Sequence, residues 1–382
     1  MHCFKIIILI FSLLNLCRTE DELIAVTALI RHGTRIPQEL YPLDPYHNYS
    51  WPFAMGDLTN QGIGELYNVG RWLRMNYDSF LSREYDVNEI YAQSVDYDRC
   101  VMSGEATLAG LYPPRSFDIW NKNIQWQPVP LHISPLNQDF VLNMNTCPKI
   151  PEQSALIRTT QIYKNIMAKY GTFFDYISKK SGQTINFSNM YPLFDTLFGE
   201  MKMHLPLPTW AQETMPLMNT LIVQYTKMDS MTMSERRIQV GALLTRIIKQ
   251  FDKAIDGRHF GTSSTIYRKF MAYFTSEWVH YDLTYALGLP SIHIPDFGVQ
   301  YYIELRKNQV GRYYVNILYR KATSMATEAV AVPMNRLNVD IDYNDFKNYT
   351  KPYLVANATE WVNLCEKFTG ATVQVHENVP SS

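Results

Sequence analysis

The sequence predicts an α/β fold with a mostly parallel central sheet flanked by helices and an inserted α-helical cap. The first observation is a continuous apolar run at 23–30, whose length and β-branched residues are typical of a strand buried on both faces. The second is the repeat of strand, loop and helix that follows, a pattern that builds parallel sheets. The third is the stretch 154–251, where helical spacing dominates and methionine is frequent.

The predicted elements follow one another at short intervals. Apolar side chains within 63–77 share one helical face, and Thr59 or Asn60 can cap the start of that helix. A short strand at 89–92 leads into a helix that runs through 100–111 and ends at two prolines. The first half of the chain therefore alternates between strands and helices.

The sheet resumes after the helical stretch, and no internal repeat is present. Later strands are expected at 270–274, 299–305 and 313–319. The predicted divisions are a signal peptide at 1–19, an α/β domain made of 20–150 and 252–382, and a helical cap insert at 151–251.

The N-terminus has the pattern of a secretory signal. Lys5 precedes the apolar stretch 6–16, and smaller polar residues follow at 17–19. The stretch is shorter than the roughly 20 apolar residues that span a bilayer, and the alternative is a buried N-terminal strand or helix. No later segment has the character of a membrane anchor. We therefore expect a soluble, exported chain, either secreted or in the lysosomal lumen.

Composition excludes several classes of protein. With 46% hydrophobic and 19% charged residues, the chain is neither disordered nor collagen-like. Its 35 basic and 36 acidic residues nearly cancel, and no run of lysine or arginine is present. We therefore expect no nucleic-acid partner, and any phosphate must be bound by a few cations placed in a pocket.

Cysteines and sequons fit an exported chain. Removal of the signal leaves Cys100, Cys147 and Cys365, so one oxidised pair and one free thiol are expected, and the spacing does not choose the pair. No grouping suggests zinc, and no metal or other cofactor is predicted. The glycosylation acceptors are Asn48, Asn186, Asn348 and Asn357.

A cationic cluster follows the first predicted strand. Arg31, His32 and Arg35 stand at its carboxyl end, the edge at which open α/β sheets bind ligands. Guanidinium groups bind phosphate oxygens bidentately, and neighbouring cations help to keep an imidazole neutral and nucleophilic. Gly33 would let the backbone approach the ligand. The alternative is a solvated basic turn.

The run at 31–37, Arg-His-Gly-Thr-Arg-Ile-Pro, resembles the signature of histidine acid phosphatases. Further segments at 56–62, 94–99 and 207–211 are similar to a helix entry, a Ser-x-Asp-x-x-Arg segment and a cap segment of the prostatic and lysosomal enzymes. The resemblance implies a sheet domain with a helical cap, a phosphohistidine intermediate, no metal, and often a homodimer. The family belongs to the same superfamily as phosphoglycerate mutase.

The resemblance assigns roles residue by residue. His32 is implied as the nucleophile, and Arg31 and Arg35 as phosphate ligands. Gln93 stands where the family has a third arginine, and Ser276-Glu277 stands where it has a His-Asp pair. Gln93 and Ser276 are therefore the expected, weaker phosphate ligands. Glu277 is the expected proton donor, because it offers the same chemistry as aspartic acid on one more methylene.

Two further assignments depend on the same likeness. His280-Tyr281-Asp282 also offers a histidine and an acid, but helical spacing after Glu277 is expected to turn it away from the pocket. Cys147 and Cys365 are similar to a family disulfide, which leaves Cys100 as the free thiol.

The leading hypothesis is a secreted acid phosphatase that hydrolyses small phosphate monoesters. The alternative is a catalytically weakened or inactive, anion-binding member of the family, because Gln93 and Ser276 replace stronger ligands. A neutral hydrogen bond is worth about 1 kcal/mol, against about 1.5 to 3 kcal/mol for a charged one. A transferase similar to phosphoglycerate mutase is disfavoured by the predicted export.

Overall fold

The structure of the protein is a computed structural model. It describes residues 21–230, 232–257, 266–290, 294–321, 323–335 and 338–366. The predicted signal peptide and its two cysteines lie outside these residues.

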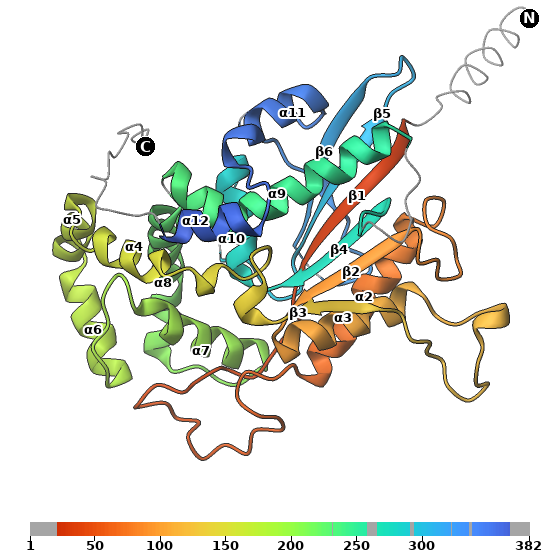
Figure 1. The fold of residues 1–382 in the computed structure, drawn as a ribbon. Coiled ribbons are helices and arrows are strands. Elements are labelled where there is room, and N and C mark those ends of the chain that lie inside the picture. The colour runs from red at the N-terminus through yellow and green to blue at the C-terminus, as the bar shows by residue number, and fades with distance from the viewer. Residues whose placement is uncertain are drawn as a thin grey trace, which may run out of the picture.

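A mixed sheet of eight strands crosses the described part of the chain (Figure 1). The strands are β1 (Glu22–Arg31), β2 (Ile90–Val95), β3 (Leu131–Ser134), β4 (Phe270–Thr275), β5 (Gln300–Lys307), β6 (Tyr313–Arg320), β7 (Val330–Ala331) and β8 (Ile341–Asp342). Their order is β3-β2-β4-β1-β5-β6-β7, and β8 pairs with β6. The strands from β3 to β1 in this order are parallel, whereas β5 to β8 extend the sheet by antiparallel pairing. The predicted α/β class with a mostly parallel centre is confirmed.

Helices flank the sheet and form a separate group between β3 and β4. They are α2 (Asn60–Asn76), α3 (Asp98–Leu111), α4 (Lys149–Ile157), α5 (Gln161–Lys169), α6 (Gly171–Ser181), α7 (Met190–Lys202), α8 (Thr209–Asp229), α9 (Met233–Ile255), α10 (Glu277–Leu287), α11 (Tyr343–Thr350) and α12 (Ala358–Glu366). Short 3₁₀ helices are η1 (Ser116–Asp118), η2 (Leu136–Gln138), η3 (Met144–Thr146) and η4 (Lys351–Tyr353). Within the described ranges, no helix combines the length and apolarity that crossing a membrane requires.

The central strand β1 is buried on both faces, as its continuous apolar sequence predicts. Ala25 and Leu29 pack in the core that includes α9, whereas Ala28 and Ile30 pack in the core beneath α2 and α3. Figure 1 shows α9 on one side of the strands and the α2–α3 pair on the other. Alternation along one strand thus fills two hydrophobic layers.

Helix α2 begins where the sequence predicts. The Thr59 hydroxyl accepts a hydrogen bond from the Gly62 amide, which satisfies one of the free donors of the first turn. The same turn explains Gly33, since a Cβ on that residue would lie 2.5 Å from the Gly62 carbonyl oxygen. The structure therefore gives Gly33 a packing role against α2 in addition to the expected approach to a ligand.

The helices α4 to α8 have a core of their own. Its buried members include Phe174, Phe187, Leu197 and Met218. Most of helix α9 also falls inside the predicted insert range, but its side chains, such as Leu244, pack in the core of the sheet. A helix from the range predicted as the cap insert therefore covers the sheet. The division into domains stays a prediction.

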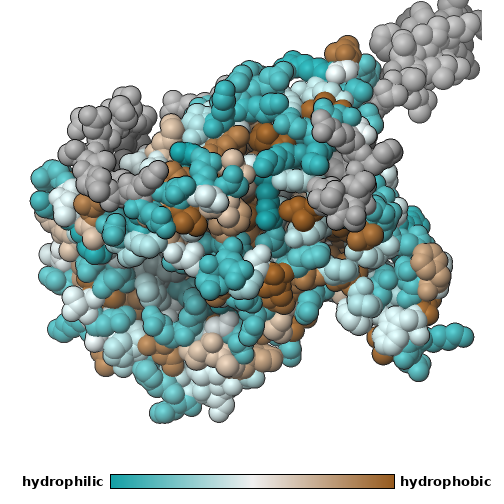
Figure 2. All heavy atoms as spheres, viewed as in Figure 1, coloured by the Kyte–Doolittle hydropathy of each residue, from teal (hydrophilic) through white to brown (hydrophobic). Residues whose placement is uncertain are grey.

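The connection between α3 and β3 forms a lobe that projects from the body of the molecule (Figures 1 and 2). Large apolar side chains in this lobe are exposed: Phe117 by 83%, Trp120 by 56% and Trp126 by 45%. Aromatic side chains gathered on a projecting lobe are more common at contact surfaces than on free ones.

Candidate active site

The ends of β1 and β4 bring the motif at 31–37 and Glu277 to one edge of the sheet. The two strands are parallel neighbours, and Arg31 pairs in register with Thr275. The His32 amide donates to the Thr275 carbonyl at 3.1 Å. Because α10 begins at Glu277, directly after β4, its first side chain lies beside those of the motif.

Arg31 and Glu277 form a buried ion pair. Arg31 Nη2 lies 2.8 Å from Glu277 Oε2, and the two residues are 1% and 3% exposed. The Tyr191 hydroxyl donates to Glu277 Oε1. Arg31 also donates to the Pro295 carbonyl. Both oxygens of the carboxyl group are thus approached by fixed donors.

His32 is fully buried and its two ring nitrogens have different surroundings. Nδ1 lies 2.9 Å from the carbonyl oxygen of Gly33 and, as the protonated nitrogen, donates to it. Nε2 lies 3.8 Å from Glu277 Oε2 and has no hydrogen-bond partner in the structure. This tautomer leaves the lone pair of Nε2 directed at the space beside Glu277.

Burial and neighbouring positive charges hold His32 neutral. Burial is the largest cause of its low pKa, followed by the charges of Arg31, Arg99 and Arg35. Together they place the pKa of His32 well below the ordinary value, although Glu277 acts in the opposite direction. A neutral imidazole in acid solution is a competent nucleophile.

Arg35 is held by Asp195 of helix α7. Its Nη2 donates to both carboxylate oxygens of Asp195, at 2.8 and 2.9 Å. The ring of Phe297 lies under both guanidinium groups, with Arg31 Cζ 4.7 Å and Arg35 Cζ 5.6 Å from its centroid. Asp195 and Phe297 thus orient cations that would otherwise repel each other.

Glu277 is ionised in this arrangement. Its burial opposes ionisation, but the charge of Arg31, together with that of Arg35 and the Tyr191 hydrogen bond, outweighs burial and lowers the pKa of Glu277. The carboxylate is therefore the anion that balances the cluster. A phosphate that took over this balance would raise the pKa of Glu277, because two anions would share the site.

Gln93 and Ser276 lie at this edge of the sheet without joining the cluster through a hydrogen bond. Gln93 Oε1 accepts from Arg246 Nη1 at 2.5 Å, and its Nε2 lies 3.5 Å from Ser134 Oγ. Ser276 is the N-cap residue of α10, but its hydroxyl makes no capping bond. Their predicted role as phosphate ligands stays a prediction.

His280 and Asp282 make their hydrogen bonds outside the cluster. His280 is buried, and its Nδ1 lies 3.1 Å from the Ser276 carbonyl oxygen. Asp282 lines a different cavity, described below. The rival pair at 280–282 therefore contacts neither Arg31 nor His32 through its hydrogen bonds.

Sequence reasoning missed the contributions of Tyr191, Asp195, Phe297 and Arg99. Tyr191 and Asp195 are four residues apart on α7, so they share one face of that helix. That spacing was visible, but the position of α7 over the sheet edge was not. Arg99, in the first turn of α3, adds a third positive charge that acts on His32.

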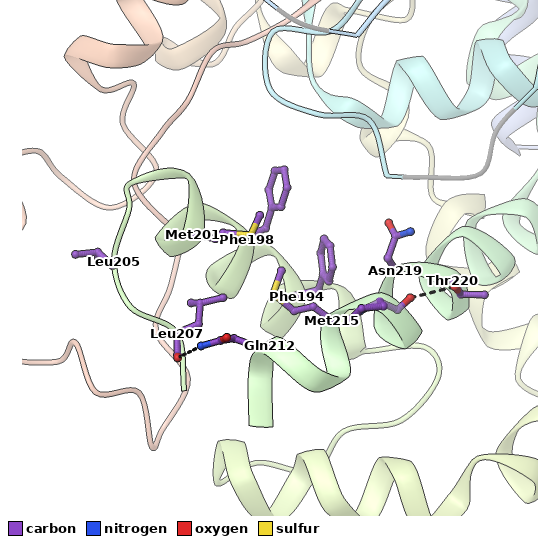
Figure 3. Close-up of a pocket in the computed structure, with 10 residues that line it drawn as sticks. Phe194, Phe198, Met201, Leu205, Leu207, Gln212, Met215, Asn219 and Thr220 are labelled. Carbon is purple, nitrogen blue, oxygen red and sulfur yellow. Dashed lines mark hydrogen bonds between the residues drawn. The ribbon is translucent and has the colours of Figure 1, made fainter. Parts of the chain in front are cut away.

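A large apolar cavity lies between helices α7 and α8, beside this cluster. Its volume is about 770 Å³, and its lining comes from α7, the loop after it and α8 (Figure 3). Phe198 connects the cavity to the site, because its ring centroid lies 5.2 Å from that of Phe297. The cationic cluster is thus separated from an apolar space by aromatic rings.

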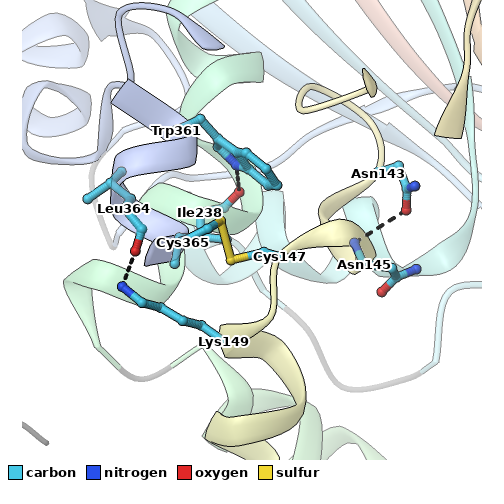
Figure 4. Close-up of a disulfide and its surroundings, with 8 residues drawn as sticks. All are labelled: Asn143, Asn145, Cys147, Lys149, Ile238, Trp361, Leu364 and Cys365. Carbon is cyan, nitrogen blue, oxygen red and sulfur yellow. Dashed lines mark hydrogen bonds between the residues drawn. A yellow bond between two sulfur atoms is a disulfide. The ribbon is translucent and has the colours of Figure 1, made fainter. Parts of the chain in front are cut away.

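The cysteines take the arrangement that the resemblance implies. Cys147 and Cys365 form a disulfide that joins the segment before α4 to α12 (Figure 4). Trp361 beside it donates from Nε1 to the Ile238 carbonyl at 2.9 Å, which attaches α12 to α9. Cys100 is free and buried, and burial raises the pKa of its thiol to about 12. Cys100 is therefore an unreactive, small apolar residue at neutral pH.

The glycosylation acceptors differ in accessibility. Asn48, Asn348 and Asn357 are exposed. Asn186 is half-buried, and its Oδ1 accepts from the amide and hydroxyl of Ser188. Glycosylation of all four stays a prediction.

The fold and this cluster define the class of protein. The model of the histidine phosphatase superfamily (branch 2) matches residues 22–320, which is most of the chain. The chain therefore belongs to this family, as the resemblance at 31–37 implied.

The chain is similar in sequence to acid phosphatases and similar in fold to a phytase. The chain is 30% identical over 368 residues to the lysosomal acid phosphatase of Xenopus laevis, a match that covers 94% of this chain and 82% of that protein. It is also 30% identical over 325 residues to the prostatic acid phosphatase of Rattus norvegicus, with 82% of each chain covered. The phytase of Citrobacter braakii superposes with a TM-score of 0.66 over 89% of this chain and 99% of its own, at 14% identity, which supports the fold alone.

Proposed function

We propose that the protein is an acid phosphatase that hydrolyses small phosphate monoesters through a phosphohistidine intermediate on His32. The observation that carries the proposal is the geometry of His32: Nε2 carries a free lone pair, lies beside Glu277, and is flanked by Arg31 and Arg35. The names of the similar proteins support the same activity. Nothing in these comparisons favours the inactive alternative.

In the proposed reaction, phosphate oxygens bind Arg31 and Arg35, and their charge raises the pKa of Glu277 so that it takes up a proton. His32 Nε2 attacks phosphorus while the bond to the ester oxygen breaks, and Glu277 gives its proton to the departing alkoxide. Water then attacks the phosphohistidine and loses its proton to Glu277. Phosphate leaves, and neutral His32 is restored.

Three positive charges act on His32 although the family arginine at position 93 is missing. Arg99 acts on His32 from α3, while Gln93, which replaces that arginine, is occupied by Arg246. Phosphate would therefore be held by Arg31, Arg35 and Arg99, with Ser276 as a neutral donor at the start of α10.

The remaining proposals concern location and assembly. We propose that the chain is exported, to the outside of the cell or to the lysosomal lumen, and glycosylated. We also propose a homodimer, supported by the exposed aromatic lobe that carries Phe117, Trp120 and Trp126.

The test is rapid mixing with a ³²P-labelled monoester followed by an alkaline quench. The wild type is expected to carry label that is stable in alkali and lost in acid, as phosphohistidine is. His32→Ala should carry none and release no phosphate, whereas His132→Ala, at an exposed histidine of β3, should behave as the wild type. A folded wild type that released no phosphate between about pH 4 and 6 would contradict the proposal.

The role of Glu277 is tested by the leaving group. Glu277→Gln should slow formation of the phosphohistidine from an alkyl phosphate by about 10²- to 10⁴-fold, the usual contribution of a general acid. It should slow formation of the phosphohistidine from 4-nitrophenyl phosphate much less, because 4-nitrophenolate leaves without a proton. Equal losses for both substrates would remove Glu277 from this role.

A further inference from the structure

A second cavity lies beside helix α10. Its volume is about 260 Å³, and side chains from α4, α8, α9 and α10 line it. None of the proposed catalytic residues is among the lining residues. Trp278 and Tyr281 do line it, and Trp278 packs against Tyr191 with ring centroids 4.9 Å apart.

Asp282 presents an unpaired carboxyl oxygen to this cavity. The residue is 5% exposed, and its Oδ1 lies 3.3 Å from the Ser230 hydroxyl. Oδ2 is buried and has no hydrogen-bond partner in the structure. A buried carboxyl oxygen without a partner is destabilising, so Oδ2 is available as an acceptor or counter-charge for a ligand that enters the cavity.

A second acid faces the same space from α8. Burial, and after it the charge of Glu235, raises the pKa of Asp229 to about 7. Burial also raises the pKa of Asp282 well above the ordinary value, with Asp229 acting in the same direction. The exposed Arg158 is the positively charged residue among the lining side chains. Two acids thus face one cation, both are harder to ionise than an ordinary aspartate, and a second positive charge in the cavity would favour their charged forms.

Aromatic rings supply the remaining walls. Tyr225, Trp278 and Tyr281 line the cavity together with the two acids. Aromatic faces attract alkylammonium groups, whereas a metal ion needs several oxygen or nitrogen ligands. Among the described residues, no group of three or more His, Cys, Asp or Glu could hold a metal ion.

We propose that this cavity binds a free, small organic cation of the alkylammonium class, with Asp282 and Asp229 as its counter-charges and the rings of Tyr225, Trp278 and Tyr281 around its methyl groups. The site goes beyond the proposed phosphatase activity, and its residues are distinct from those that would hold phosphate. A volume of about 260 Å³ fits a free amine.

Titration calorimetry with choline tests the proposal on the whole protein at about pH 7.5. One choline is expected to bind per chain, and 3,3-dimethylbutan-1-ol, its neutral counterpart of the same shape, should not bind. Asp282→Asn keeps the acceptor for Ser230 and should weaken choline by about 10-fold or more. Asp175→Asn, at an exposed aspartate of α6, should leave the affinity unchanged.

Wild-type protein alone provides a second measurement, which does not depend on how a variant folds. Choline should displace protons from Asp229 and Asp282, so the observed heat should change between buffers of different ionisation enthalpy. The affinity for choline should fall as the pH is lowered from about 8 to about 5, because a larger fraction of the two acids is then protonated and uncharged.

Several outcomes would overturn the proposal. They are the absence of binding, equal binding of the neutral alcohol, or unchanged affinity in Asp282→Asn. Competition by saturating inorganic phosphate would place choline in the catalytic pocket instead. Competition by phosphatidylcholine vesicles would show that the site takes a lipid headgroup and not a free amine.

Discussion

Replacement of Tyr191 by phenylalanine tests whether Glu277 sets the acid pH range of the proposed reaction. In the wild type, the Tyr191 hydroxyl donates to Oε1 of the buried Glu277, and this bond helps to lower the pKa of that carboxyl group. The hydroxyl stabilises the charged form of Glu277 more than the protonated form. Without it, the pKa of Glu277 must rise.

The magnitude follows from the strength of the lost bond. A hydrogen bond to a charged group is worth about 1.5 to 3 kcal/mol. Since about 1.4 kcal/mol corresponds to one pKa unit, the pKa of Glu277 is expected to rise by about one to two units. The bond lies on the side of the carboxyl away from Arg31, which holds Oε2, so the ion pair at 2.8 Å stays in place.

The assay is the pH profile of kcat with an alkyl phosphate, for which protonation of the leaving group is essential. The alkaline limb of kcat reports the pKa of the proton donor in the enzyme–substrate complex. For Tyr191→Phe this limb should move to higher pH by about one to two units. Tyr67→Phe, at an exposed tyrosine of α2, serves as the control and should leave the limb unmoved. A limb that stays in place in Tyr191→Phe would refute the assignment of Glu277 as donor.

Three further substitutions test the surroundings of the site. Asp195→Asn leaves Arg35 buried without its anion, so the free energy of unfolding should fall by about 3 to 5 kcal/mol. Inorganic phosphate should then raise the Tm of the variant more than that of the wild type. Equal shifts in Tm would mean that phosphate does not reach Arg35. Burial raises the pKa of Glu200 from 4.5 to about 9, so the folded state keeps a proton that the unfolded state has lost, and wild-type stability falls as the pH rises between these values. The slope is up to about 1.4 kcal/mol per pH unit. Glu200→Gln removes this loss, and its Tm should exceed that of the wild type near pH 9 but not near pH 4.5; parallel Tm curves would contradict the shift. Gln93→Arg restores the family residue but places its charge against that of Arg246, so we expect a lower Tm and no gain in kcat/KM. A gain in kcat/KM at unchanged Tm would show that Arg246 moves aside.

The sequence predicts the α/β core well because its signals are local. The apolar run at 23–30 is long enough to identify a strand buried on both faces, and the structure places β1 there. Thr59 is the N-cap that its hydroxyl and position indicate. The location of the cationic turn can also be predicted, because a turn that directly follows a parallel strand lies at the carboxyl edge of the sheet.

Contacts between residues that are far apart in the sequence could not be predicted from these local signals. Asp195 pairs with Arg35 over a sequence separation of 160, and Arg246 reaches Gln93 over 153. The sequence around Asp195 or Arg246 does not indicate its partner, because a charged residue on a helix is predicted to be solvated until the packing of that helix is known. The resemblance identified Gln93 as a substitution but could not indicate that Arg246 occupies it.

The position of β4 has a consequence for biosynthesis. β4 lies between β1 and β2 in the sheet, although it follows both of them in the chain and is separated from them by helices α4 to α9. During synthesis from the N-terminus, β2 can pair only with β3, and β1 has no neighbour to pair with until residues 270–275 emerge. Their apolar faces would need protection by chaperones in the interval, since unpaired strands aggregate readily. His32 and Glu277 come together only at that late step, so a growing chain cannot hydrolyse phosphate esters before its sheet closes.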